Sequence, residues 1–583
     1  MHARPSFVSP TAAAPLAAFA LLAAVLLGLP RTAQAQWQPD GVPVCTYAGG
    51  QSGVAGSIPG SIYLAWVDYR SSPHHIYAQR LDTNGNPQWT QDGIAVSQTT
   101  TDQSGPKLWG DGSTGVIVAY SENATTIRAQ HLDSNGNQLW GSTGVLVSSQ
   151  STGFKTVDTM IGDGSFSTIT APGVVILWTN TNGSTGTPWV QSLTSAGAAR
   201  WAAGGIELNS GECYYPAIVT NGTGSISAPK EVFAVWALKP TQSLPQTDIY
   251  AQRLSGATGA LQWASGGIAI TDTHKAYEPT LTKTATGTAI VAWSDGRNGN
   301  EDIYAQQLAS GGATWIANGL PVCRSPGSQD VAAILPDGTG GAIIAWDDDR
   351  NEATSGWDIY AERIDASGGR RWALDGIPLC TAPGDQTYRP SPIAPLVTGD
   401  GASGMVLAWV DYATTKVMTQ RVDTTGTVLW PANGVAVTAT TAQQSAPALL
   451  PDFSGGAYVG WVDQRVSTPH IYANHVLPQG GLAAVEASNP AAIRLSLPRP
   501  NPSTSGESVE FDLPGSEPVS ASVYDVRGAL IRTLAHDLIE PAGHGELDWD
   551  GRDARGAAVP AGIYFLRFAA GTETEVRRLV TMH

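Results

Sequence analysis

One recurring segment constrains the fold of this chain more than any other feature. It begins as Ile-Tyr-Ala-Gln-Arg-Leu at Ile76 and ends as Asn-Pro-Gln-Trp at Trp89. Similar segments run over residues 249–263, 303–315 and 359–372. A unit repeated at this period indicates an array of similar small modules, each packed against its neighbours.

Each unit contains four short segments with the residue pattern of β-strands. In one unit these segments are residues 331–335, 342–346, 359–364 and 372–379. Asp337-Gly338 separates the first two segments, and such pairs favour two-residue hairpin turns because both positions tolerate positive φ. Four antiparallel strands per unit predict the blades of a β-propeller.

The number of units follows from two aromatic positions that recur along the chain. An aromatic residue ends the second segment of each unit, at Trp66, Tyr120, Trp178, Trp236, Trp293, Trp346, Trp409 and Trp461. A second Trp begins the fourth segment, at Trp37, Trp89, Trp140, Trp201, Trp263, Trp315, Trp372 and Trp430. The sequence therefore predicts an all-β chain with an eight-bladed β-propeller over residues 36–481.

The two ends of this array are complementary. Trp37 has no Ile-Tyr-Ala-Gln segment before it, and the last such segment, Ile471–Val476, has no Trp after it. We expect the N-terminal segment Trp37–Val44 to supply the outer strand of the last blade. This closure removes the free sheet edges that promote aggregation, and a linear stack with unpaired ends is the alternative.

Composition and charge narrow the range of functions. The chain has 66 Gly, 19 Trp and a formal net charge of −17, which argues against a nucleic-acid surface, since that needs clustered Lys and Arg. Phosphate-binding Gly-rich loops, zinc-type Cys/His spacings and calcium-binding loops are absent from the sequence, so no metal or cofactor is predicted.

The N-terminal residues 1–35 have the pattern of a secretory signal peptide, with an apolar run over residues 16–29 and a small-x-small site at residues 33–35. An uncleaved anchor is the alternative, and no later segment is apolar enough to cross a membrane. The four cysteines are expected to be free thiols, because Cys45, Cys323 and Cys380 each lie eight residues after a repeat Trp and so occupy equivalent, separated positions.

The outer segments resemble the tryptophan-docking motif of quinoprotein-like propellers. In Leu254-Ser-Gly-Ala-Thr-Gly-Ala-Leu-Gln-Trp263, a Gly precedes the Trp by four residues, and the pairs Gly85/Trp89 and Gly197/Trp201 keep this distance. The resemblance covers residues 37–481 and implies a propeller with docked blades. The quinoprotein enzymes carry a vicinal cysteine pair that this chain lacks, so the resemblance implies no cofactor.

Residues 482–497 are rich in Ala and small residues and are expected to form a linker. Residues 498–583 contain short alternating segments between turns, which predict a small Ig-like β-sandwich. The motifs Val523-Tyr-Asp-Val-Arg-Gly528 and Pro560-Ala-Gly-Ile-Tyr-Phe-Leu566 resemble the FlgD-type Ig-like domain and the type A sorting domain of type IX secretion. This resemblance implies contact with secretion or sorting machinery and retention at the cell surface.

The most regular polar pattern is Trp-x-Asp-x-Arg at the end of the second segment. Its charged residues are Asp68 and Arg70, Asp295 and Arg297, Asp348 and Arg350, and Asp463 and Arg465. We expect Arg to pair with an acid before the next strand, such as Asp302 or Asp358. Four near-identical copies favour a structural ion pair over a binding or catalytic site. For the run Asp347–Asp349, a solvated loop is favoured over a cation site, because three carboxylates alone provide too few ligands.

The segments entering each first strand differ between units, as expected for a surface that binds a ligand. The candidate ligand-binding residues are Tyr214, Tyr215, His274, Tyr277, Tyr388 and Arg389, and ordinary packing at the rim is the alternative. Amphipathic aromatic side chains near a central opening suit a carbohydrate or protein ligand. We assign no catalytic residue, because no Ser/His/Asp set or close carboxylate pair can be assembled from the sequence.

These patterns predict a secreted or outer-surface protein that acts as a non-catalytic binding or adhesion module. The first alternative is a polysaccharide-active hydrolase or lyase that uses the central cleft. The second, supported by less, is a structural envelope protein.

Overall fold

The computed structural model describes residues 37–57, 61–112, 114–148, 150, 152–164, 173–221, 229–239, 247–386, 396–482, 493–496, 498, 501–504, 506–513, 517–540, 543–571 and 573–582. The described chain is almost entirely β, and its single helix, α1, is the short segment Glu352–Ser355. The predicted signal peptide lies outside the described residues. No helix in the described part of the chain is long and apolar enough to cross a membrane.

Eight small antiparallel sheets follow one another between residues 37 and 482. We number them 1 to 8 by the order of their first strands. Sheets 1 to 4 contain β2 Gln51–Ser57, β3 Ile62–Asp68, β4 His75–Leu81 and β5 Ile94–Ala95; β6 Gln103–Gly110, β7 Val116–Glu122, β8 Thr126–Leu132 and β9 Val145–Leu146; β10 Phe154–Gly162, β11 Val174–Asn182, β12 Thr185–Leu193 and β13 Ile206–Glu207; β14 Cys213–Thr220, β15 Val232–Leu238, β16 Asp248–Leu254 and β17 Ile268–Ala269.

Sheets 5 to 8 have the same order, with one additional short strand in sheet 5. They contain β18 Ala276–Lys283, β19 Ala289–Asp295, β20 Asp302–Ala309, β21 Gly312–Ala313 and β22 Leu320–Cys323; β23 Gln329–Pro336, β24 Ala342–Asp348, β25 Asp358–Ile364 and β26 Ile377–Cys380; β27 Val397–Gly399, β28 Met405–Asp411, β29 Lys416–Val422 and β30 Val435–Ala436; β31 Gln444–Pro451, β32 Ala457–Asp463, β33 His470–Val476 and β1 Val42–Cys45.

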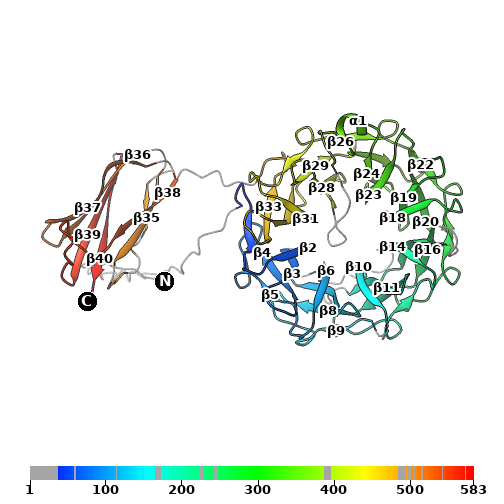
Figure 1. The fold of residues 1–583 in the computed structure, drawn as a ribbon, viewed down its shortest axis with the longest axis horizontal. Coiled ribbons are helices and arrows are strands. Elements are labelled where there is room, and N and C mark those ends of the chain that lie inside the picture. The colour runs from blue at the N-terminus through cyan, green and yellow to red at the C-terminus, as the bar shows by residue number, and fades with distance from the viewer. Residues whose placement is uncertain are drawn as a thin grey trace, which may run out of the picture.

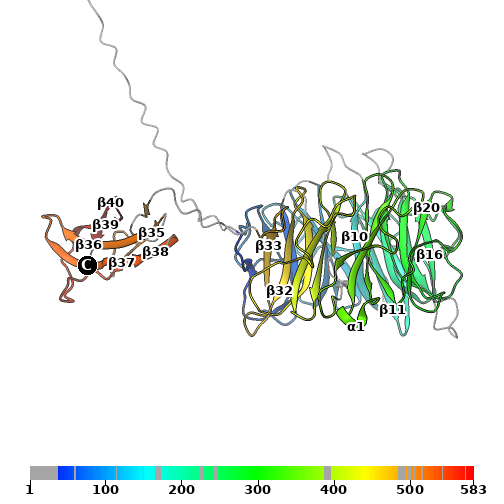
Figure 2. The ribbon, with the colours of Figure 1, turned by 90° about the horizontal axis from the view of Figure 1, so that it is seen from above.

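The eight sheets are arranged around a common centre, with the first strand of each sheet innermost (Figure 1). Each inner strand contacts the inner strand of the next sheet, in the cyclic order β2, β6, β10, β14, β18, β23, β27, β31 and back to β2. Seen from the side, the strands run between the two flat faces of the ring (Figure 2). No individual sheet closes on itself among the described strands, so the ring is built by packing between sheets.

The N-terminal strand lies where the unmatched Trp37 predicts. β1 pairs antiparallel with β33, with Val42 opposite Ala473 and Pro43 opposite Tyr472. Trp37 packs against Tyr458, with 5.7 Å between ring centroids. The first and last described segments of the ring therefore belong to the same sheet, and β1 covers the edge of β33.

The second strand of each sheet forms the core, because neighbouring sheets cover both of its faces. Every residue of β3, β19 and β24 is buried. Their continuous apolar sequences are typical of strands buried on both faces. The aromatic residue near the end of this strand has almost no exposed surface in any of the eight sheets.

The outer Trp of each sheet docks onto the following sheet, as the Gly-to-Trp spacing predicts. The Trp37 indole N–H donates to the Thr83 carbonyl oxygen at 2.9 Å. Gly85 has φ +84°, and a Cβ there would lie 3.1 Å from the Trp37 ring, which explains the recurring Gly. Equivalent indole bonds link Trp89 to Ser134, Trp140 to Ser195, Trp201 to Gly256, Trp263 to Ser310, Trp372 to Thr424 and Trp430 to Pro478.

The prediction of a two-residue Asp-Gly hairpin is wrong. β23 ends at Pro336 and pairs with Ala342, so five residues connect the strands. The Asp337 carboxylate accepts hydrogen bonds from the backbone N–H of Thr339 and of Gly341, both at 2.8 Å. A side chain that organises a longer loop replaces the tight turn, as short acidic side chains commonly do.

Residues 494–581 form two further sheets. One contains β34 Arg494–Leu495, β35 Glu507–Leu513 and β38 Gly543–Trp549; the other contains β37 Leu530–Glu540, β36 Glu517–Asp525, β39 Gly562–Ala570 and β40 Glu573–Thr581. Their apolar faces meet, with 5.0 Å between the rings of Phe511 and Phe568. This packing is that of an Ig-like sandwich.

Two details of this sandwich bear on the sequence analysis. The motifs Val523–Gly528 and Pro560–Leu566 come together, because strands β36 and β39 are neighbours in one sheet, with Val523 opposite Leu566. Arg494–Leu495 was expected in the linker but pairs with β35, and Leu495 is buried. The partner of an alternating strand cannot be chosen from the alternation alone, because every such strand has one apolar face.

Candidate functional site

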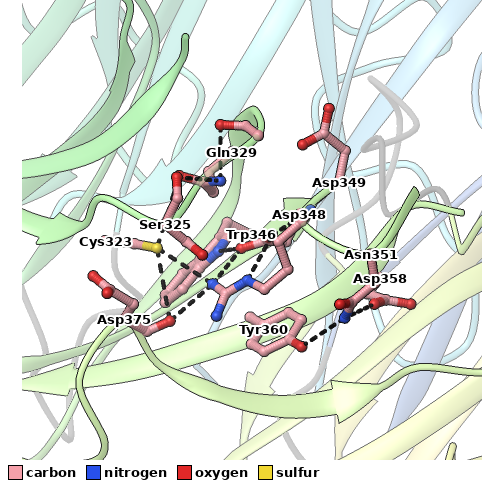
Figure 3. Close-up of polar contacts among 12 residues, drawn as sticks. Cys323, Ser325, Gln329, Trp346, Asp348, Asp349, Asn351, Asp358, Tyr360 and Asp375 are labelled. Carbon is pink, nitrogen blue, oxygen red and sulfur yellow. Dashed lines mark hydrogen bonds and ion pairs between the residues drawn. The ribbon is translucent and has the colours of Figure 1, made fainter. Parts of the chain in front are cut away.

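The Trp-x-Asp-x-Arg motif forms the same buried cluster once in each of four sheets. In sheet 6 the Trp346 indole N–H donates to Asp348 at 2.8 Å, and Arg350 binds both carboxylate oxygens of Asp348 (Figure 3). The guanidinium lies 3.9 Å from the centre of the Tyr360 ring and donates to the Asp375 carbonyl oxygen at 2.9 Å. The cluster therefore joins the second strand to the third strand and to the loop before the fourth.

Sheets 1, 5 and 8 repeat this arrangement. Asp68 pairs with Arg70, Asp295 with Arg297 and Asp463 with Arg465, and each Arg stacks on a Tyr of the third strand. Burial by itself would raise the pKa of Asp68, but hydrogen bonds from Arg70 and Trp66 outweigh it and lower that pKa. The pair is charged at neutral pH and internally satisfied, so it offers little to a ligand.

The expected partners of these arginines were wrong. Asp302 accepts a hydrogen bond from Asn298 at 2.6 Å, and Asp358 accepts one from Asn351 at 2.9 Å. Each Arg pairs instead with the Asp two residues before it. Residues two apart lie on the same face of an extended chain, which brings carboxylate and guanidinium together at once.

All four cysteines are free, as predicted, and the structure also shows that all four are buried. Burial raises the pKa of the Cys45 and Cys323 thiols to about 12. Both sulfurs lie beside the cluster, 3.5 Å from an Arg70 nitrogen and 3.4 Å from an Arg350 nitrogen. Because a thiol of such high pKa is protonated at neutral pH, these cysteines are unsuited to nucleophilic chemistry.

The inner strands carry a different repeated feature, a β-bulge near the start of the strand. The register shifts in β6, β14, β18 and β31, among others. In five of these strands the bulged residue has positive φ: Gly53 in β2, Gly105 in β6, Tyr215 in β14, Glu278 in β18 and Ala446 in β31. Tyr215 at φ +50° and Glu278 at φ +48° are bulky residues in a conformation that favours glycine. A bulge redirects side chains, and here it does so at neighbouring positions of sheets 4 and 5.

A cavity of about 410 Å³ opens beside these two residues. Three aromatic side chains line it, Tyr215, Tyr277 and Trp357. Its other lining residues are Glu278, Glu301, Ser328 and Asp330. The Ser328 hydroxyl donates to Glu301 at 2.7 Å, and the Gln329 N–H donates to the Glu301 carbonyl oxygen at 2.8 Å, which joins sheets 5 and 6 at the cavity wall.

A second cavity of about 320 Å³ shares Tyr215 and Tyr277 with the first. Tyr214 and Lys239 line it as well. Hydrogen bonding to Glu212 raises the pKa of Tyr214 to about 12, and Lys239 binds the other oxygen of Glu212 at 3.1 Å. The side chains of Tyr215 and Tyr277 thus line both cavities and lie between them.

The structure brings together Tyr214, Tyr215 and Tyr277, three of the six candidate ligand-binding residues. His274 instead forms a hydrogen bond of 2.5 Å with Asp248 and is not among the described residues that line either cavity. Tyr388 and Arg389 lie outside the described residues. Sequence reasoning missed Glu278, Glu301, Ser328, Asp330 and Trp357. The signal for Glu278 was present, because Tyr277-Glu278-Pro279 departs from Ser104-Gly105-Pro106 of sheet 2.

A further pair of charged residues lies on inner strands β6 and β10. Burial lowers the pKa of Lys107 to about 8 and raises that of Asp158 to about 7. The Thr179 hydroxyl donates to Asp158 at 2.7 Å. No group of His, Cys, Asp and Glu in the described residues is arranged to hold a metal ion.

Comparison with known proteins identifies one part of the chain. Residues 500–574 match the family model of the FlgD Ig-like domain. No curated protein sequence matches the chain.

Solved structures similar to the chain are distant. They include PorZ of Porphyromonas gingivalis, a surface component of the type IX secretion system, at 11% identity over 90% of this chain and 73% of PorZ, with a TM-score of 0.21. Dipeptidyl peptidase 4 of Porphyromonas gingivalis is 9% identical over 80% of this chain and 65% of its own, with a TM-score of 0.38. The polysaccharide lyase Uly1 is 8% identical over 78% and 94%, with a TM-score of 0.37. Similarities of this size carry no argument about the function of this chain.

Proposed function

We propose that residues 36–481 form an eight-bladed β-propeller that acts as a non-catalytic binding or adhesion module. The propeller assignment is supported by eight sheets, seven of four strands and one of five, whose inner strands contact each other in cyclic order. The observation that carries the binding function is the aromatic and acidic cavity beside Tyr215 and Glu278. Bulky residues held in left-handed backbone conformations are typical of sites where function outweighs local strain.

The proposed destination is the cell surface or the medium. Residues 1–35 act as a signal peptide, the residues between 482 and Arg494 as a linker, and the C-terminal domain as a sorting or anchoring module. Support for the last comes from the FlgD Ig-like family match and from the sequence resemblance to type A sorting domains. Two strains of the native host test this, one making the full chain and one stopping at residue 482. Loss of propeller antigen from the cells in the second strain is expected; equal display in both would contradict the sorting role.

Binding is tested with an array of carbohydrates and peptides, probed with residues 36–583. The variant Tyr215→Ala should lose the binding signals that the natural sequence gives on the array, because the Tyr215 side chain lines both cavities. Tyr412→Ala is the matched control, since Tyr412 is equally a surface tyrosine, 61% exposed, and lines neither cavity. Equal loss in both variants, or in neither, would contradict binding at this cavity.

A polysaccharide-active hydrolase or lyase is the second candidate. It is favoured by the presence of Glu278, Glu301 and Asp330 in one cavity with Tyr277, because glycoside hydrolysis uses paired carboxyl groups. Product release from envelope polysaccharides that stops in Glu278→Gln and Glu301→Gln would establish it. A chain that neither binds nor cleaves would leave the structural envelope role.

A further inference from the structure

An amide side chain recurs on the third strand of seven of the eight sheets. In each of them the amide nitrogen donates to the carbonyl oxygen of the residue that follows the docked Trp, as from Gln79 to Thr90 at 2.8 Å. The amide oxygen accepts the backbone N–H of the next residue in the strand, as Gln79 does from Arg80 at 2.9 Å. This side chain therefore ties the third strand to the segment that carries the docked Trp. The seven residues are Gln79, Gln130, Gln191, Gln252, Gln306, Gln420 and Asn474.

Sheet 6 has a carboxyl group at this position, Glu362. Its Oε1 atom accepts the backbone N–H of Arg363 at 2.9 Å and that of Trp372 at 2.8 Å, as the amide oxygens do in other sheets. Its Oε2 atom stands where the amide nitrogen stands elsewhere, and it is buried without a hydrogen-bond partner among the described residues. The carbonyl oxygen at the equivalent position is that of Ala373, which follows Trp372. Two acceptor atoms thus replace a donor and an acceptor.

An ionised carboxylate is costly at this position. It has no proton to donate, whereas a protonated carboxyl group has one O–H. Tyr360 and Ile364, on the same face of β25, belong to an apolar core with Trp315 and Val322 of sheet 5. A charge that faces a carbonyl oxygen in such surroundings lacks compensation, and a proton on Glu362 removes the cost.

Burial dominates the electrostatics of Glu362. It raises the pKa of Glu362, and hydrogen bonds from the backbone N–H groups of Trp372, Arg363 and Arg371 lower that pKa by less. The charge of Arg370 lowers it further, and the pKa still remains above its ordinary value. The folded protein therefore favours the protonated form of Glu362 more than the unfolded chain does.

The other titratable groups around Glu362 keep their charge state while it titrates. Two neighbouring arginines are held in ion pairs, Arg363 with Asp337 and Arg371 with Asp365. The pKa of each of these two acids is lowered, so both remain charged. The apolar core contributes two groups whose raised pKa keeps them uncharged at neutral pH, Tyr360 and Cys323.

We propose that Glu362 keeps its proton in the folded protein and donates it to the Ala373 carbonyl oxygen, and that loss of this proton at rising pH loosens the joint between sheets 6 and 7. The joint is formed by Trp372, whose indole N–H donates to the Thr424 carbonyl oxygen of sheet 7 at 3.1 Å. Glu362 holds Trp372 through its backbone N–H, so ionisation of Glu362 acts directly on the docked residue. This pH-sensitive joint is independent of the proposed binding function.

The melting temperature of residues 36–583 as a function of pH tests the proposal. Because the folded-state pKa of Glu362 is raised, its stabilisation is fully present below about pH 4 and is lost as the pH rises through the folded-state pKa. Glu362→Gln restores the amide of the other sheets and donates at every pH. Its melting temperature relative to the natural sequence should therefore rise by about 2 °C from pH 4 upward and then level off.

The repeat supplies a converse variant and the chain a control. Gln79→Glu places the same acid in sheet 1, so it should match the natural sequence most closely at pH 4 and fall below it as the pH rises. This variant also tests the chemistry if Glu362→Gln fails to fold. Glu352→Gln is the control, because Glu352 is exposed in α1, and its melting difference should stay constant with pH.

Infrared spectroscopy tests the proton itself. The spectrum of the natural sequence minus that of Glu362→Gln should contain the C=O band of a protonated carboxyl group, and this band should persist to a higher pH than the bands of exposed carboxyl groups. Absence of the band would overturn the proposal. A melting difference for Glu362→Gln that does not change with pH would overturn it as well, because Glu362 would then have the same charge in the folded and unfolded chain.

Discussion

The outer part of the ring and its inner strands differ in what recurs from sheet to sheet. In the outer part, the same contacts recur from sheet to sheet. One is the hydrogen bond from an outer Trp indole, such as that of Trp37 or Trp89, to a carbonyl oxygen of the following sheet. The other is the Trp–Asp–Arg–Tyr cluster in sheets 1, 5, 6 and 8. At the inner bulge, one backbone conformation recurs while the residues change from Ser-Gly to Tyr-Glu. Repeated side chains hold the sheets together, and changing side chains on a repeated backbone mark the surface that recognises something.

The Trp–Asp–Arg–Tyr cluster is complete in some sheets and incomplete in others. The buried indole N–H of Trp178, Trp236 and Trp409 has no hydrogen-bond partner among the described residues. Sheet 7 retains Asp411 but lacks the Arg, and the Asp411 carboxylate accepts hydrogen bonds from the Ala413 and Thr414 N–H groups instead. The fold therefore tolerates loss of the cluster in some sheets, where the packing of the Trp ring is retained.

The largest effect should come from removing residues 37–45, which breaks the outer contacts at the closing sheet. Sheet 8 would lose β1, expose the edge of β33 and leave the core around Trp37, Val42 and Val44 unfilled. We expect a loss of about 5 kcal/mol or more in the free energy of unfolding, the scale of large-to-small changes in a core. Denaturant unfolding measures it; an unchanged midpoint would show that β1 does not hold the ring together.

The next effect concerns the cluster, compared between sheets 1 and 7. Asp68→Asn should lower the free energy of unfolding by about 2 kcal/mol, because Arg70 loses a buried charged partner. Asp411→Asn should have a much smaller effect, since Asp411 has no arginine partner among the residues that the structure describes. Because the folded-state pKa of Asp68 is lowered, its stabilisation is present above about pH 4 and is lost as the pH falls through that lower pKa. Equal effects of the two substitutions at pH 7 would contradict the role of the cluster.

A smaller effect is expected at the inner strands from Asp158→Asn. Burial raises the folded-state pKa of Asp158 to about 7, so the folded protein favours the neutral acid and loses stability as the pH rises from 4 to 7. The variant is neutral throughout, so its melting temperature relative to the natural sequence should rise over this range, by about 2 °C, and level off above it. A difference that stays constant from pH 4 to 8 would show that Asp158 is charged throughout.

The smallest effect on stability, with the largest on recognition, should come from Tyr215→Gly. Glycine adopts φ +50° without strain, so we expect the free energy of unfolding to change by less than about 1 kcal/mol. Ligand binding should be abolished, because the substitution removes the Tyr215 aromatic ring from both cavities. Gly53→Ala is the converse test at the equivalent bulge, where a side chain introduces strain and should destabilise without affecting binding. A strongly destabilised Tyr215→Gly would mean that the ring serves packing.

Much of the framework could be predicted from the sequence. The period of the Ile-Tyr-Ala-Gln segments predicted four strands per unit, and the unmatched Trp37 predicted the pairing of β1 with β33. Both predictions depend on local residue patterns and on counting. The partner of each Arg was predicted wrongly, because an acid at the start of the next strand, such as Asp302 or Asp358, is also within reach of a long side chain at the preceding turn. The extended backbone before Arg350 places Asp348 on the same face, and its carboxylate accepts the Arg350 hydrogen bonds.

The candidate site was accessible from the sequence only in part. Tyr214, Tyr215 and Tyr277 were identified because aromatic residues interrupt an otherwise small and polar pattern. Glu301, Asp330 and Trp357 lie in three separate stretches of chain, and each one taken alone is an ordinary surface residue.

Residue periodicity, alternation and the recurring Gly and Trp are properties of neighbouring residues, so they determine strand, turn and repeat wherever they occur in the chain. The cavity depends instead on the angle between successive sheets and on the β-bulge that turns Tyr215 and Glu278 toward it. Those arise when inner strands from different units pack around one centre, and no stretch of sequence contains that geometry.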